Sequence, residues 1–161
     1  MNATLQQWEV RLTSAQTGHY VASERYSRLN NLLGMPLVIL SSFVSAFLFA
    51  DQSNSVISLF LKCAGIAVAL LASIQTFVRP AEKAELHRVK ATKYGSLKRK
   101  VETFLATEKS EEDLLSFFKV LVAEWNAIAE DSPVTPHRIR QEIKKVIGED
   151  LHRDSQKKKE P

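Results

Sequence analysis

Residues 32–50 read LLGMPLVILSSFVSAFLFA, and residues 56–78 read VISLFLKCAGIAVALLASIQTFV. The first stretch contains no charged residue, and the second contains only Lys62. A helix crosses the hydrocarbon core of a bilayer with about 20 apolar residues, and the two stretches provide about 19 and about 23. Neither stretch has the polar stripe that a surface helix of a soluble protein presents to water. The sequence therefore predicts an all-α membrane protein with a two-transmembrane helical hairpin, in which residues 51–55 form the external turn.

The alternative is a soluble helical-bundle protein in which residues 32–78 form the core. Such a protein would have to surround two all-round apolar helices with amphipathic partners, yet the flanking segments are heavily charged. The average composition hides this segregation, because 45% of all residues are hydrophobic and the mean hydropathy is only −0.14. The first stretch is too long and too far along the chain for a cleavable signal, and a second stretch follows it. We therefore favour two retained spans.

Residues 4–31 are predicted to form a cytoplasmic helix that runs directly into the first span. Apolar side chains recur there at three- and four-residue steps, which is typical of one face of an amphipathic helix. A second stripe of the same kind follows the hairpin. The two stripes contain Leu5, Trp8, Leu12, Ala15, His19, Ala22 and Tyr26, and then Ala84, His87, Ala91, Tyr94, Leu97, Val101, Phe104 and Leu105.

Further helices are predicted after the hairpin. Residues 80–131 hold cytoplasmic helices, the first beginning at Pro80, which suits a first helical position, and the next beginning after Ser110, which is followed by acidic residues. Residues 132–161 hold a last helix that reaches about Ile147 and then a basic tail.

The positions of lysine and arginine predict the orientation. Basic residues close to the ends of spans remain in the cytoplasm. The turn contains none, whereas both outer ends of the hairpin are basic. We therefore expect a two-pass protein of the cell membrane with both termini in the cytoplasm. The basic residues concerned are Arg25, Arg28, Arg79, Lys83, Arg88, Lys90 and Lys93.

Small residues at four-residue steps predict where helices pack in lipid, because association there depends on close approach and hydrogen bonds. The helix-packing candidates are Ser42, Ala46, Ala50 and Gly65. A polar file along the second span provides pore-lining candidates, namely Lys62, Ala69, Ser73 and Thr76. Two readings of Lys62 remain open: its ammonium group reaches the outer headgroups or pairs with Asp51, or it faces water in an oligomer.

The sequence contains no pattern that predicts catalysis. No phosphate-binding loop, nucleophile elbow or HExxH metalloprotease motif is present, and no histidine has a cysteine or carboxylate at ligand spacing. The single cysteine, Cys63, excludes an internal disulfide and a thiolate-rich zinc site. We expect no enzymatic activity, no metal and no cofactor. Basic residues beside a span more simply contact anionic lipid than nucleic acid, so no nucleic-acid partner is predicted either.

The whole pattern resembles a known family. The features that carry the resemblance are Trp8 and Arg11 in the leading helix, residues 26–30 entering the first span, residues 75–80 ending the second, and residues 81–87 beyond it. Together they resemble the SLATT family, the SMODS- and SLOG-associating two-transmembrane effector domains of microbial conflict systems. The resemblance implies a pore-forming effector in antiviral defence that is triggered by an external sensor or a nucleotide-signal-producing protein. A charged residue in the second span is a departure from that pattern.

Three functional hypotheses follow from the residues and the resemblance. The first is a membrane-embedded effector whose copies form a homo-oligomer around a pore or ion channel. The second is a membrane-anchored scaffold whose helices recruit a partner without conducting. The third is the soluble bundle described above.

Overall fold

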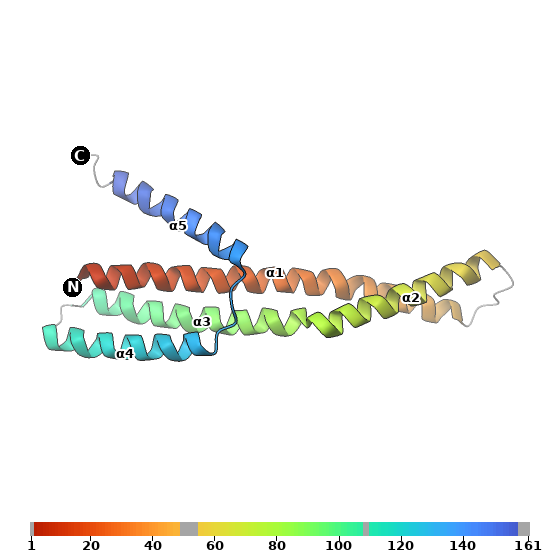
Figure 1. Cartoon of the computed structure of the whole chain (residues 1–161), viewed down its shortest axis with the longest axis horizontal. Helices are drawn as coiled ribbons and strands as arrows, with labels where there is room; N and C mark the ends of the chain where they lie inside the picture. Colours follow the sequence, from red (N-terminus) through yellow and green to blue (C-terminus); the bar gives the residue numbers. More distant parts are fainter. Residues whose placement is uncertain (1, 49–54, 108–109, 158–161) are drawn as a thin grey trace. The chain divides into compact units, whose positions relative to one another are not determined.

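The computed structural model describes residues 2–48, 55–107 and 110–157, and this part of the chain is all α, as predicted (Figure 1). The predicted turn therefore lies outside the described residues, apart from Ser55. The helices are α1 (Asn2–Leu48), α2 (Ser55–Val78), α3 (Pro80–Leu105), α4 (Glu111–Glu130) and α5 (His137–Lys157).

The chain divides into two compact units. We call Met1–Glu24 together with Glu85–Pro161 the bundle unit, and Arg25–Ala84 the hairpin unit. Helix α1 contributes its first part to the bundle unit and its remainder to the hairpin unit without a break. The amphipathic segment and the first apolar stretch therefore belong to one continuous helix.

The bundle unit is held by the apolar stripes of α1, α3 and α4, which lie side by side (Figure 1). Aromatic rings fill much of this core: the centroids of Trp8 and Trp125 are 5.4 Å apart with their planes at 86°, and Trp8 meets Phe118 in the same edge-to-face manner at 5.8 Å. Edge-to-face pairs of this kind add stability beyond the area that they bury. The buried members of the core are Leu5, Leu12, Tyr94, Leu97, Val101 and Leu121.

Two helix boundaries in the bundle unit follow from local chemistry. Ser110 is the N-cap of α4: its side chain accepts from the backbone N–H of Asp113, whose carboxylate accepts in return from the backbone N–H of Ser110. Helix α5 begins after Pro136, whose carbonyl accepts from the N–H groups of Ile139 and Arg140. It continues to Lys157, beyond the predicted end near Ile147, because helix-forming residues without a proline follow Gly148.

The hairpin unit pairs the second part of α1 with α2. Helix α2 ends where predicted, because Pro80 disfavours helical backbone at Arg79. Arg79 instead adopts a φ of 47°, in the left-handed region, and its N–H still donates to the carbonyl of Gln75 at 3.0 Å. Helix α3 then begins at Pro80, and the N–H of Lys83 donates to the carbonyl of Arg79.

The hairpin unit exposes most of its apolar surface. Two helices in the described part of the chain are long and apolar enough to cross a membrane, and their most apolar stretches are almost entirely unburied. The core helices of a soluble protein would instead bury these stretches. Exposed apolar areas of this extent are typical of surfaces that contact lipid or another protein. Their larger members are Leu32, Met35, Val38, Ile39, Phe43, Leu59, Phe60, Ile66, Leu70, Ile74 and Phe77.

Candidate functional site

The seam of the hairpin determines which side of α2 remains available for function. Leu61 and Ala64 are the buried residues of α2. Farther along, the amide of Gln75 packs against Gly34, where a Cβ atom would lie 3.5 Å from Nε2 of Gln75. A glycine at this point lets the backbone of α1 lie close to a polar side chain of α2. The side of α2 that carries Leu61, Ala64 and Gln75 is therefore covered by α1.

The four pore-lining candidates share a different side of α2. Lys62, Ala69, Ser73 and Thr76 are all exposed. Because successive helical residues are turned by about 100°, this file lies roughly a quarter of a turn from Leu61. The apolar residues Leu59, Leu70 and Phe77 lie about half a turn from Leu61 by the same geometry. Helix α2 thus has a seam, a polar flank beside it and an apolar back.

The hydroxyl group of Ser73 is already satisfied within its own helix. Its Oγ donates to the carbonyl of Ala69 at 2.7 Å. In α1 the Oγ of Ser42 donates in the same way to the carbonyl of Val38 at 2.8 Å. Such bonds leave hydroxyl oxygens able to accept from water or from a second chain, while removing most of the cost of facing lipid.

The helix-packing candidates that the structure describes are not buried within one chain. Ser42 and Ala46 are exposed, and Ala50 lies outside the described residues. Beside Gly65 there is open space, because a Cβ atom built there would meet nothing within 4 Å. The small residues therefore remain available for contacts between copies, and such contacts stay a prediction. Asp51, the suggested partner of Lys62, also lies outside the described residues.

The bundle unit contains a buried polar centre that the sequence did not predict. His19 of α1 and His87 of α3 are both buried, and their Nδ1 atoms are 2.9 Å apart. One Nδ1 must donate and the other must accept, so the two imidazoles are in different tautomers. Tyr94 stacks on His19 with the ring centroids 5.5 Å apart. Lys90, one of the basic residues from which the orientation was predicted, is also buried, with its Nζ 3.9 Å from Oδ2 of Asp131.

Burial and nearby positive charge keep the histidine pair neutral. The pKa of His19 is lowered to about 4, mainly by burial and in addition by the neighbouring His87 and Lys90. Burial also lowers the pKa of His87. Among the described residues no three His, Cys, Asp or Glu side chains gather closely enough to hold a metal ion. We therefore interpret the two imidazoles as a packed, uncharged pair.

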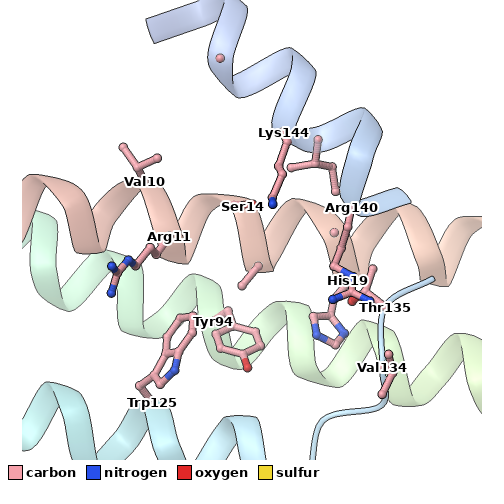
Figure 2. Close-up of a pocket in the computed structure, with 14 residues that line it drawn as sticks. Val10, Arg11, Ser14, His19, Tyr94, Trp125, Val134, Thr135, Arg140 and Lys144 are labelled. Carbon is pink, nitrogen blue, oxygen red and sulfur yellow. The ribbon is translucent and has the colours of Figure 1, made fainter. Parts of the chain in front are cut away.

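A groove of about 690 Å³ opens beside this pair. It is lined by α1, α5 and the segment that connects α4 with α5, together with Tyr94 of α3 and Trp125 of α4 (Figure 2). The groove exists because only the first turns of α5 contact α1. There Ile139 and Ile143 pack on Ala22, and α5 then diverges from α1. Gly18 permits this close contact, since a Cβ atom there would lie 3.2 Å from Cδ1 of Ile143. The groove and its charges were also missed in the sequence, because each residue belongs to a separate segment.

A scan against protein-family models, a search of curated proteins and a search of solved structures each found no match to this chain.

Proposed function

We propose that this chain is a two-pass protein of the cell membrane, with both termini in the cytoplasm, whose copies assemble into a pore. The observation that carries the proposal is the polar flank of α2: Lys62, Ala69, Ser73 and Thr76 lie on one exposed side, next to the seam. Two spans are too few to enclose water, so conduction requires several copies. In such an assembly each chain directs this flank inward and its apolar back toward lipid.

The cost of placing Lys62 within a span supports a water-filled environment. A lysine at the centre of a span costs about 2.5–3.5 kcal/mol on insertion scales, and less near an end. Contact with water in a pore removes most of this cost. The small neighbours Ala69 and Ser73 would leave room for ions along the same file.

The resemblance to the SLATT family supports a role in antiviral defence, in which opening of the pore kills or arrests the infected cell. The trigger would come from a separate sensor or nucleotide-signal-producing protein that acts on the bundle unit. The membrane-anchored scaffold remains the competing function. Replacing residues 32–78 by an unrelated hairpin separates the two, because a scaffold keeps its activity and a pore loses it.

Cysteine accessibility tests the proposed lumen without requiring an open channel. In a Cys63→Ala background, which removes the chain's only thiol, Ser73→Cys or Thr76→Cys is introduced on the polar flank. Leu70→Cys on the apolar back is the matched control. We expect a charged, membrane-impermeant thiol reagent to modify the flank at least tenfold faster than the back. Equal rates at the two positions, in protein shown to be oligomeric by crosslinking, would refute the lumen.

Conduction itself is tested in liposomes. We expect wild-type protein to release trapped ions, and Lys62→Glu to shift the preference from anions toward cations. Lys62→Arg is the control, because it retains the positive charge and should retain the preference. The proposal would be contradicted if release were no greater than from empty vesicles. This result counts when oligomers are confirmed and a sensor protein has been added to exclude a missing activator.

A further inference from the structure

The groove beside the histidine pair carries an unbalanced positive charge. Among the described residues that line it, three side chains are cations, Arg11, Arg140 and Lys144, and none is a carboxylate. None of these three cations forms an ion pair with a described residue. The exposed ion pairs elsewhere show the contrast: Lys100 lies 2.6 Å from a carboxylate oxygen of Glu124, and Arg88 lies 2.7 Å from Glu85. A concave surface with charge of one sign concentrates ligands of the opposite sign.

The cations are directed into the groove from two helices. In Figure 2 the side chains of Arg140 and Lys144 extend from α5 toward α1, and both line the groove together with Ser14 and His19 of α1. Arg140 and Lys144 are four residues apart and so lie on one face of α5. Arg11 lines the groove from α1 and its guanidinium carbon lies 5.5 Å from the ring centroid of Trp8. An arginine and a lysine arranged in this way suit phosphate oxygens.

The remaining lining is mostly apolar and aromatic. Ala15, Tyr94, Trp125 and Ile143 line the groove. Sites for small molecules are typically 300–1,000 Å³ with an apolar lining and a few polar groups that fix orientation. At 690 Å³ the groove falls within that range and exceeds what inorganic phosphate would fill. The ligand therefore needs an apolar or flat body as well as its negative charge.

We propose that this groove binds a phosphate-bearing small molecule with an apolar or flat body, its phosphate held by Arg140 and Lys144. Arg11 adds positive charge at the other side, and the hydroxyl groups of Ser14 and Thr135 provide further hydrogen bonds. A nucleotide and the headgroup region of an anionic phospholipid share this chemistry. The proposal does not depend on pore formation, because binding is measured directly.

The test uses the full chain in an uncharged detergent, with three probes: ATP, inorganic pyrophosphate and short-chain dihexanoyl phosphatidylglycerol. Binding is measured by calorimetry and by fluorescence, since Trp125 lines the groove. We expect ATP or the short-chain lipid to bind saturably with a Kd below about 1 mM, and pyrophosphate to bind at least tenfold more weakly because it lacks the apolar body. The tighter of the two organic probes identifies the source of the phosphate.

Charge removal then locates the site. Arg140→Gln combined with Lys144→Gln should weaken binding at least tenfold. The matched control combines Arg138→Gln with Lys145→Gln, which removes the same charge from exposed positions of α5 that do not line the groove, and should change the Kd less than threefold. Unchanged tryptophan emission in the absence of probe shows that both variants are folded. Failure of all three probes to saturate, or equal weakening by the two pairs of substitutions, would overturn the proposal.

Discussion

Acidification should destabilise the bundle unit through the histidine pair. His19 is buried against His87, Lys90 and Tyr94 of α3, and Arg140 of α5 lines the same groove as His19. Protonation of either imidazole would add a positive charge beside Lys90, and protonation of the accepting Nδ1 would also remove the acceptor from the 2.9 Å contact between the two Nδ1 atoms. Both consequences disfavour the folded state.

The sign and size of the effect follow from the pKa of His19. Its folded value of about 4 lies below the unfolded value of 6.5, so the unfolded chain binds the proton more readily. Stability is therefore complete above pH 6.5 and falls as the pH drops through 6.5 toward 4. Between pH 7.5 and pH 5 the loss from this one group is at most about 2 kcal/mol. The lowered pKa of His87 acts in the same direction.

The chain's two tryptophans make the assay selective for the bundle unit. Trp8 and Trp125 both pack in its core, so urea unfolding followed by tryptophan fluorescence in detergent reports on this unit. We expect the wild-type free energy of unfolding to fall by about 1–2 kcal/mol between pH 7.5 and pH 5. His19→Gln, which cannot titrate, should lose less than half as much.

The control is His137→Gln, because His137 is exposed at the start of α5. This variant should follow the wild-type pH dependence. Carboxylate titration contributes equally to all three proteins and cancels in the comparison. If His19→Gln and wild type lose the same free energy on acidification, the buried neutral pair is not the cause, and the reasoning fails.

Three further perturbations test the core, a helix cap and the contacts between copies. Leu12→Ala should destabilise the bundle unit by about 2–5 kcal/mol because Leu12 is fully buried, whereas Leu115→Ala on the exposed side of α4 should change it by less than about 0.5 kcal/mol; urea unfolding measures both. Ser110→Ala removes one half of the capping box and should cost about 1 kcal/mol in the same assay, while Ser110→Asp should retain most of it. Gly65→Leu should leave the single chain folded, since open space surrounds Gly65, yet weaken oligomers measured by crosslinking; an unchanged oligomer would place the interface elsewhere.

The apolar stripes could be predicted because their signal is local. Leu12, Leu97 and Leu121 lie at helical spacing from other apolar residues, and the structure buries all three in one core. Pro80 likewise predicts the break between α2 and α3, because a proline disfavours helical backbone at the residue before it, and Arg79 is non-helical. In each case the residues that determine the structure are within a few positions of one another.

The polar features of the bundle unit could not be predicted, because they depend on contacts between distant segments. His19 and His87 are 68 positions apart and belong to two different stripes. Each stripe shows that its histidine faces the core, but neither shows the register that makes the two meet. In the sequence Lys90 is one more basic residue beside an apolar stretch, and only the structure shows that it is buried and lies near Asp131. The groove depends in the same way on where α5 leaves α1.

The hairpin unit poses a different problem. The sequence predicts that the polar residues of α2 share one side of the helix, but it does not show that this side faces the water of a pore. Ser73 satisfies its own hydroxyl group by donating to Ala69, and Ser42 does the same with Val38. Serines bonded in this way face lipid at little cost, so their presence does not by itself distinguish a pore from an inert anchor. Lys62 is different, because no backbone carbonyl of its own helix can remove the cost of its charge. The conduction hypothesis therefore depends chiefly on Lys62, and substitutions there discriminate between a pore and an anchor more sharply than Ser73→Ala can.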